Sequence, residues 1–192
     1  MATERSTKML ILSSARTLFA EKGYDNTPVE EICALAGIAK GTFFYHFESK
    51  QAIVRYILAM QLKEYAAKLK EQMNSFKDAI SKAEYFIAVL VELGRGGNEC
   101  DRYFRQHESE WYITVVREER SLALLPLLEQ AIEEGIAQGY FRISHPDVCA
   151  AVAFHGIDAF LHSDAGQEED ARHGIKEMAA KTLGLKETEL AI

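Results

Sequence analysis

The amino-acid sequence predicts an all-α protein of about nine helices. Apolar residues recur with helical spacing along nearly the whole chain, and alternating strand-like patterns bounded by Asn-Gly or Asp-Gly turns are absent from it. Only 3 of the 192 residues are proline and 48% are hydrophobic, which favours helices around a packed core.

The first two helices are marked by clear start and stop signals. One is expected over residues 6–22, with apolar residues on one face and Gly23 ending it in a left-handed conformation. The next is expected over residues 28–36. A Thr-x-x-Glu pattern begins at Thr27, which predicts a capping box with Pro28 at the first helical position.

The later helices are longer. A third is expected over residues 40–47, and a fourth, capped by Ser49, extends to about residue 73. The other five are expected over residues 78–93, 99–120, 125–138, 146–162 and 168–183, with breaks at Gly- or Pro-containing links. A boundary is expected where short helices give way to long ones, which divides the chain into domains 4–64 and 65–192.

Residues 28–47 are the most informative segment. Two short helices meet at a tight turn containing Gly37, and the small residues Ala34 and Ala36 allow the helix axes to approach closely. This arrangement is typical of a helix-turn-helix, whose second helix enters the major groove of DNA. An ordinary pair of helices within a bundle would show the same spacing.

The composition of the helix expected over residues 40–47 favours the DNA-binding interpretation. Gly41 near its start permits close approach of the backbone to another surface, such as a DNA strand. Phe44 and Phe47 are expected to anchor the helix to the core. The groups able to donate hydrogen bonds or supply positive charge to DNA are Thr42, Tyr45, His46, Lys40 and Lys50.

At these positions the sequence closely resembles the TetR family of bacterial transcriptional regulators. The resemblance covers roughly residues 8–55 and rests on Gly23, Tyr24, Thr27, Ile32, residues 36–38, 40–43 and 45–47, Ser49 and Lys50. Elsewhere it is limited to helix number, chain length and a Glu-Gly-x-x-x-Gly-Tyr-Phe stretch at residues 134–141. It implies a three-helix DNA-binding domain joined by a long fourth helix to a helical bundle that dimerises and binds an effector.

The resemblance also implies which residues contact DNA. Phosphate contacts are implied for Thr27, Lys40, Tyr45, His46 and Lys50, and positions nearest the bases for Gly41, Thr42 and Phe43. The sequence departs from the family pattern twice. Ala39 stands where Ser is common and Phe44 where Tyr is common, so each departure removes a hydroxyl group.

The distribution of charge limits how DNA could be bound. The net charge of −7 argues against nonspecific coating of nucleic acid, and residues 1–50 hold equal numbers of acidic and basic side chains. Affinity is therefore expected to come from geometry, with helix N-termini near phosphates and two copies reading a palindrome about 34 Å apart. Salt is expected to weaken such binding through counterion release.

The larger domain is expected to dimerise and to enclose an effector pocket. The helix over residues 146–162 carries Val152, His155, Gly156 and Ala159 on neighbouring faces, which suits a four-helix interface but equally suits packing within one chain. Candidate pocket residues, which would otherwise be core aromatics or polar tips, are Tyr85, Tyr103, His107, Trp111, Tyr112 and His155.

A metal site and an extracytoplasmic location are not expected. His155, Asp158 and His162 share a helix face, but no second Cys/His pair at a recognised spacing accompanies them, so neither metal nor cofactor is predicted. The three cysteines are interpreted as reduced core residues of a cytoplasmic protein. The sequence shows no signal-peptide pattern and no apolar stretch of about 20 residues, so no membrane partner is expected.

Together these observations predict a homodimeric DNA-binding regulator that binds a palindromic operator and is released by a small molecule. A repressor is favoured over an activator. Two alternatives stay open. One is an all-α enzyme using His155, Asp158 or His107 as acid–base groups, although the sequence lacks a phosphate-binding loop and a nucleophile elbow. The other is an adaptor that binds proteins through an acidic surface. The enzyme alternative leaves the composition of residues 40–50 unexplained.

Overall fold

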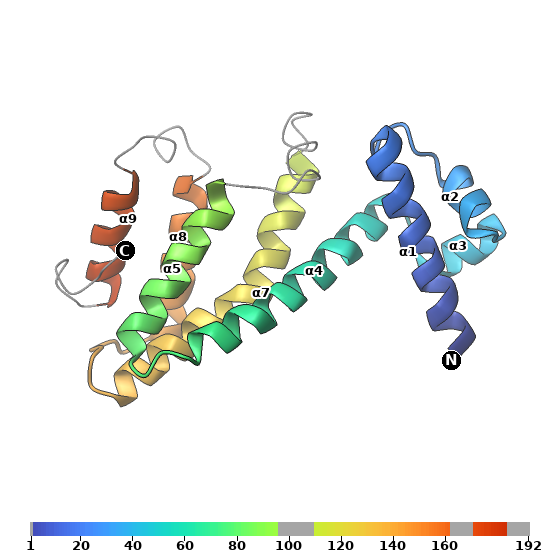
Figure 1. Ribbon diagram of the computed structural model, residues 1–192. Coiled ribbons are helices and arrows are strands. Elements are labelled where there is room, and N and C mark those ends of the chain that lie inside the picture. Colours follow the sequence, from blue (N-terminus) through green and yellow to red (C-terminus); the bar gives the residue numbers. More distant parts are fainter. Residues whose placement is uncertain (1, 96–109, 162–170, 184–192) are drawn as a thin grey trace. The chain divides into compact units, whose positions relative to one another are not determined.

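The computed structural model describes residues 2–95, 110–161 and 171–183, and all regular structure within these ranges is helical (Figure 1). This confirms the all-α prediction. The described helices are α1 (Ala2–Lys22), α2 (Val29–Ala36), α3 (Lys40–His46), α4 (Lys50–Met73), α5 (Ala79–Arg95), α7 (Glu110–Ala137), α8 (Pro146–Leu161) and α9 (Ala171–Leu183). No helix in these ranges combines the length and the apolar character needed to cross a membrane.

The described residues form two compact units with separate cores. The first comprises residues 2–61, and the second comprises residues 62–95, 110–161 and 171–183. Helix α4 spans the boundary between the units, since it starts in the first and ends in the second.

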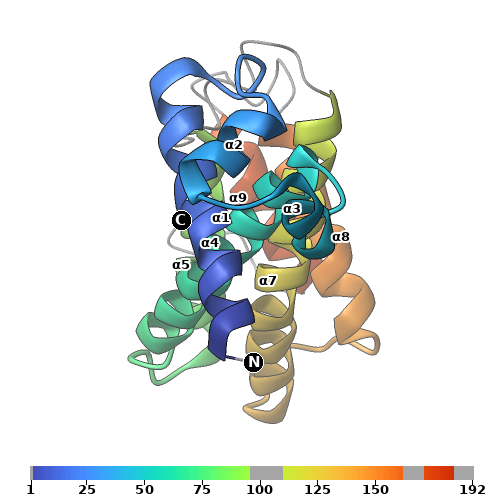
Figure 2. The same ribbon diagram turned by 90° about the vertical axis from the view of Figure 1, so that its right-hand side faces the viewer.

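The first unit packs α1, α2, α3 and the start of α4 around a small apolar core. Ile11, Ile32, Phe43 and Ile53, one from each helix, are fully buried there. Figure 2 presents α1, α2 and α3 toward the viewer. Helix α2 ends at Gly37 with a φ of 66°, and the next amide, that of Ile38, donates to the Cys33 carbonyl at 3.0 Å. This tight turn sends the chain directly into α3.

Several expected helix ends are confirmed. Gly23 has a φ of 83° and follows α1, and Gly139 has a φ of 81° and follows α7. Ser49 Oγ accepts the amide hydrogen of Ala52 at 3.1 Å, so Ser49 caps α4. Asp78 caps α5 in the same way, accepting from the Ser81 amide at 2.8 Å.

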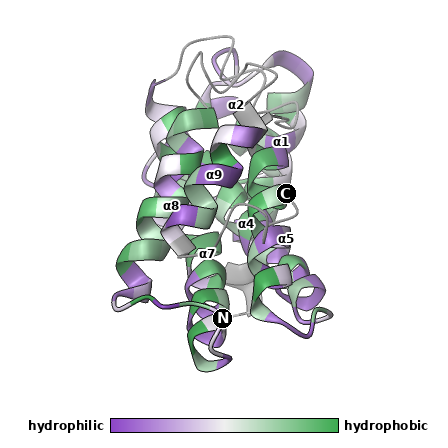
Figure 3. Ribbon diagram, turned by 90° about the vertical axis from the view of Figure 1, so that its left-hand side faces the viewer, coloured by the Kyte–Doolittle hydropathy of each residue, from purple (hydrophilic) through white to green (hydrophobic). Residues whose placement is uncertain are grey.

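The second unit packs α5, α7 and α8 against one another, with α9 on α8. Along α8 and α9 hydrophobic and hydrophilic residues alternate around the helix, as expected of helices with one buried face (Figure 3). The largest fully buried side chains of this core are Leu69, Phe86, Ile87, Leu90, Leu124, Leu128, Ile132 and Phe154.

The predicted break before Pro126 is wrong, because α7 continues through this residue from Glu110 to Ala137. Proline lacks the N–H that would bond to the carbonyl of Leu122, four residues earlier. Leu122 is 71% exposed, so that carbonyl lies on the side of the helix that water reaches. Leu124 and Leu128 are buried on either side of the proline and hold both halves of α7 to the core.

The Glu-Gly-x-x-x-Gly-Tyr-Phe stretch forms the end of α7. Beyond Gly139 the chain folds back, and the Tyr140 amide donates to the Gly135 carbonyl at 2.9 Å. Phe141 is then 2% exposed, with its ring against Gly135. A Cβ at Gly135 would lie 2.1 Å from Phe141 Cδ2, so this glycine makes the space for the ring.

A buried ion pair links three helices of the second unit. Arg120 of α7 and Asp158 of α8 are each 4% exposed, and Nη1 lies 3.4 Å from Oδ1. Arg120 Nη2 also donates to the Leu93 carbonyl near the end of α5, at 3.1 Å. Arg117, which is half-exposed, places Nε 3.5 Å from the other carboxylate oxygen of Asp158. The charges therefore tie α5, α7 and α8 together.

Candidate nucleic-acid interface

Helix α3 presents one face to solvent and buries the other. Gly41 is exposed, and a Cβ placed on it would meet nothing within 4 Å. Tyr45 is 72% exposed, with its ring edge-on to that of His46 at 5.1 Å between centroids. Thr42 and His46 are half-buried. A polar and aromatic surface without a protruding side chain at position 41 is therefore open to an external partner.

The two adjacent phenylalanines are reversed relative to the prediction. Phe43, expected nearest the bases, is fully buried and packs on Phe47, so that expectation is wrong. Phe44, expected in the core, is 48% exposed and lies edge-on against Phe43. The reason is the helical period. Positions 43 and 47 share the buried face, whereas position 44 lies about 100° further around the helix.

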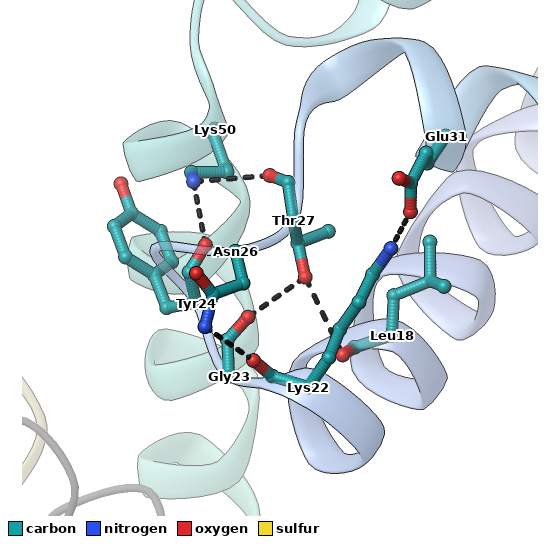
Figure 4. A network of polar contacts seen from close by, with 8 residues as sticks. All are labelled: Leu18, Lys22, Gly23, Tyr24, Asn26, Thr27, Glu31 and Lys50. Atoms are coloured by element: carbon teal, nitrogen blue, oxygen red, sulfur yellow. Dashed lines mark hydrogen bonds and ion pairs between the residues drawn. The ribbon is translucent and has the colours of Figure 1, made fainter.

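Thr27 does not cap α2, and the predicted capping box is wrong. Pro28 occupies the cap position, and no side-chain hydrogen bond caps the helix. Thr27 is instead fully buried, and its hydroxyl donates to the carbonyls of Gly23 at 2.8 Å and Leu18 at 3.4 Å (Figure 4). Because no surface of its side chain remains for a phosphate, we do not keep Thr27 among the proposed DNA contacts.

Lys50 points to the turn that precedes α2 (Figure 4). Its Nζ donates to the carbonyls of Tyr24 at 2.6 Å and Thr27 at 3.0 Å, and it lies 4.0 Å from the centre of the Tyr24 ring. Partial burial lowers the pKa of Lys50, while the nearby carboxylate of Asp25 raises it. Burial and Asp25 together raise the pKa of Tyr24 to about 12.

Lys40, at the start of α3, is exposed and paired with the exposed Glu30 of α2. The Nζ–Oε1 distance is 2.5 Å. The hydrogen bond and charge of Lys40 lower the pKa of Glu30, and those of Glu30 raise the pKa of Lys40. Both groups face water, so the ammonium can exchange this carboxylate for another anion at little cost.

Lys8 of α1 has a position that the sequence did not indicate. Its Nζ lies 3.8 Å from the ring centre of Tyr56 and 5.2 Å from that of Phe47, at the end of α3. A cation–aromatic contact between helices distant in sequence leaves no local pattern, so only the tertiary structure reveals it.

The predicted effector residues are only partly described, since Tyr103 and His107 lie outside the described residues. Tyr112 is 3% exposed, and Trp111 beside it is half-buried. The Tyr85 hydroxyl donates to Gln72 Oε1 at 3.0 Å. His155 is exposed on α8, where Nε2 lies 3.4 Å from Ser121 Oγ.

A small cavity of about 10 Å³ in the second unit is lined by other residues, namely Lys70, Met73, Asn74, Lys82, Leu127, Gln130, Ala131 and Glu134. The three residues considered as metal ligands, His155, Asp158 and His162, are not seen together at one site. Asp158 is buried against Arg120, and His162 lies outside the described residues. Within the described ranges, no three His, Cys, Asp or Glu side chains are grouped to hold a metal ion.

The short helices, the left-handed turn at Gly37 and the exposed face of α3 define a helix-turn-helix protein. Residues 11–57 match the family model described as bacterial regulatory proteins, tetR family. The N-terminal region of the chain is therefore similar to the regulators of this TetR family.

Known proteins similar to the chain include two regulators of Escherichia coli strain K12. The chain is 30% identical to the HTH-type transcriptional regulator UidR over 94 residues, which are 48% of this chain and 46% of UidR. It is 33% identical to the HTH-type transcriptional regulator RutR over 97 residues, 50% of this chain and 45% of RutR. The chain thus spans a little under half the length of these relatives.

The fold extends beyond the shared N-terminal region. The crystal structure of RolR in complex with resorcinol superimposes with a TM-score of 0.69 and covers 98% of this chain and 92% of RolR. The sequences are 23% identical, so this similarity concerns the fold alone.

Proposed function

We propose that the chain is a homodimeric, sequence-specific DNA-binding transcriptional regulator, and specifically a repressor that binds a palindromic operator. The observation that carries this proposal is the outward face of α3 in a TetR-type helix-turn-helix. Gly41, Phe44 and Tyr45 are exposed there, and none of them belongs to the buried core of the first unit. An exposed aromatic and polar helix face of this kind suits insertion into the major groove.

The proposed contacts follow from exposure. Gly41, Thr42 and Phe44 are placed nearest the bases, with the Phe44 ring suited to the methyl group of thymine. Phosphate contacts are assigned to Lys40, Tyr45 and His46, whose side chains are exposed or half-buried at the same surface. Phe43 and Thr27 are left out because both are fully buried.

Dimerisation is proposed through α8 and α9. The apolar residues Val148 and Val152 of α8 are 54% and 59% exposed, and His155 and Ala159 continue the same exposed face. Two helices from each copy would form a four-helix interface around a twofold axis. Two α3 helices about 34 Å apart would then read the two halves of a palindrome.

Release by a small molecule is the regulatory part of the proposal. The effector is placed near Tyr85, Tyr103, His107, Trp111 and Tyr112, whereas His155 is assigned to the dimer face because it is exposed beside Val152. Aromatic residues suit a flat aromatic effector, the class of compound to which the resorcinol bound by RolR belongs. Displacement of α4 would carry the response to α3. An effector that weakens DNA binding must itself bind less tightly to the DNA complex by the same factor.

The proposed role requires neither catalysis nor a cofactor, and it places the protein in the cytoplasm with chromosomal DNA. The deciding experiment is selection of bound sequences from random duplex DNA by the purified full chain. A palindrome is expected. Its affinity should fall linearly with salt on logarithmic axes, because phosphate contacts release counterions.

A matched pair of variants tests the assignment to α3. Tyr45→Ala should weaken binding to the selected duplex by about tenfold or more, whereas Tyr140→Ala, in the second unit and 46% exposed, should not. Recovery of no common sequence, or an affinity independent of salt, would refute the proposed function. Equal binding by both variants would refute the placement on α3.

A further inference from the structure

Lys50 joins the two ends of the helix-turn-helix segment. The turn at residues 23–28 precedes this segment. The segment itself, residues 28–49, contains α2 and α3 and ends where α4 begins. Lys50 is the first residue of α4 and directly follows this segment. Its ammonium group donates to the backbone carbonyls of Tyr24 and Thr27, which directly precede the segment (Figure 4).

The turn that Lys50 contacts is itself firmly attached to α1. The Thr27 hydroxyl donates to the carbonyls of Leu18 and Gly23, and the Asn26 side-chain amide donates to the Lys22 carbonyl at 3.1 Å. The Tyr24 ring, which lies against the Lys50 ammonium, also packs on Phe19 of α1 at 5.4 Å between centroids. Lys50 therefore connects the start of α4 to a fixed point on α1.

The two lysines near α3 differ in how easily they can leave their partners. Lys40 is paired with an exposed carboxylate, so a phosphate can replace Glu30 at little cost. Lys50 is half-buried between two neutral carbonyls and an aromatic face. Moving its ammonium to a phosphate would take this donor from the Thr27 carbonyl and would leave the Tyr24 carbonyl with the Thr27 amide, 3.2 Å away. The loss of these hydrogen bonds opposes the move.

We propose that Lys50 is a positioning residue, which holds the turn before α2 against the start of α4 and so sets the direction of α3, instead of binding a phosphate. This inference rests on the proposed DNA-binding function and replaces the contact that the family resemblance implies for Lys50. A displacement of the first turn of α4 acts on the helix-turn-helix through this ammonium group.

The first test needs no DNA. Residue-resolved amide hydrogen exchange is compared in the full-length chain, in Lys50→Met and in Lys63→Met, which removes an exposed positive charge from the same helix. In Lys50→Met, exchange in the turn at residues 23–28 and in the first turn of α2 should accelerate by about tenfold or more, while α7 stays unchanged. Unchanged exchange in the turn would overturn the proposal whether or not the chain binds DNA.

The second test separates positioning from phosphate binding by salt dependence. On the duplex selected by the unaltered chain, Lys40→Met should reduce the slope of log affinity against log salt by about 0.9 for each phosphate that position 40 no longer neutralises. Lys50→Met should lower affinity by about tenfold at every salt concentration with the slope unchanged, because removing the ammonium misdirects α3 without changing how many counterions are released. Thermal unfolding of both variants verifies that the chains are folded at the assay temperature.

The outcomes distinguish the two proposals. A reduced slope in Lys50→Met identifies Lys50 as a phosphate contact and overturns the positioning role, while the DNA-binding function stands. Unchanged affinity and slope in Lys50→Met also overturn it. If the unaltered chain selects no duplex, the proposed function fails, and the hydrogen-exchange comparison still decides whether Lys50 holds the turn.

Discussion

Gly37 and Gly41 stand one helical turn apart in sequence but meet different constraints. Gly37 adopts a φ of 66°, which strains any residue that has a Cβ. Gly41 is in α3, where an added Cβ would meet nothing within 4 Å. The turn therefore requires its glycine, whereas the fold alone does not require glycine at position 41.

The substitutions Gly41→Ala and Gly37→Ala should change stability in opposite directions. Gly41→Ala should raise the free energy of unfolding by about 0.5–1 kcal/mol, because alanine loses less backbone entropy in a helix. Gly37→Ala should lower it by about 1–2 kcal/mol through left-handed strain. Denaturant titration of both variants measures these changes.

The same Gly41→Ala variant should bind the selected duplex less tightly, since the added methyl group separates the backbone from the bases. A variant that is more stable but binds more weakly is the expected signature of a glycine kept for an external surface. If Gly41→Ala bound as tightly as the unaltered chain, the close approach of this position to DNA would be wrong.

Individual side chains show where sequence reasoning stops. The surface character of Tyr45 and Lys40 follows from their chemistry, and both are indeed exposed. Phe43 and Phe44 cannot be told apart by chemistry, because either ring could fill the core. Their positions in the helical period do distinguish them, because Phe43 lies one turn before the buried Phe47 and Phe44 does not share that face. Thr27 likewise has the residue type of a cap, but its hydroxyl donates to the carbonyls of Leu18 in α1 and of Gly23 just after α1.

At the scale of elements, the helix ends marked by Gly23, Gly37 and Ser49 are confirmed, whereas the capping box at Thr27 and the helix break before Pro126 are wrong. Glycine and serine at Gly23, Gly37 and Ser49 end or start helices through local backbone and side-chain geometry, which the sequence contains. The helix continues through Pro126 because burial of the leucines on both sides opposes the effect of the proline, a tertiary effect that a local rule omits.

The start of α3 lacks a side-chain cap and can be improved. Ala39 has the extended conformation of a capping residue, with φ −74° and ψ 150°, but its methyl group accepts no hydrogen bond. Ala39→Ser should raise the free energy of unfolding by about 0.5–1 kcal/mol. Ser49→Ala, which removes an existing cap from α4, should lower it by a similar amount. Denaturant midpoints that fail to move in opposite directions would contradict the cap assignments.

The ion pair between α7 and α8 predicts a large effect of a single truncation. Asp158→Ala should lower the free energy of unfolding by about 3–5 kcal/mol, because Arg120 would stay buried without its carboxylate. The double variant Arg120→Met with Asp158→Leu should recover most of this loss, since apolar side chains replace the pair. Urea unfolding of the single and double variants measures the coupling, and a loss below about 1 kcal/mol for Asp158→Ala would contradict it.

At the scale of the whole molecule, the proposed dimer depends on the exposed face of α8. Val152→Glu should convert the dimer into monomers, because a carboxylate beside its copy across a twofold axis is desolvated and repelled. Met60→Glu changes an exposed apolar residue of α4 and should leave the assembly intact. Sedimentation velocity distinguishes monomer from dimer. A Val152→Glu variant that sediments as the unaltered chain would place the interface elsewhere.

The all-α class could be predicted from the sequence because periodicity and helix-end signals are local. The placement of the effector pocket stays a prediction, because residue type alone does not decide it. Tyr85, Trp111 and Tyr112 are aromatic residues on helices, but aromatic residues serve cores and pockets equally well. The cavity of about 10 Å³ in the second unit is only the size of a water molecule, so it does not test this placement.

The ring of Phe141 resting on Gly135 has a consequence for how the chain tolerates mutation. In a library containing every single substitution, position 135 should reject all side chains in a screen for protein abundance, since even a methyl group collides with that ring. Position 41 should accept many residues in the abundance screen and reject them only in a screen for operator occupancy. The two glycines would then report separately on the integrity of the second unit and on engagement of the genome.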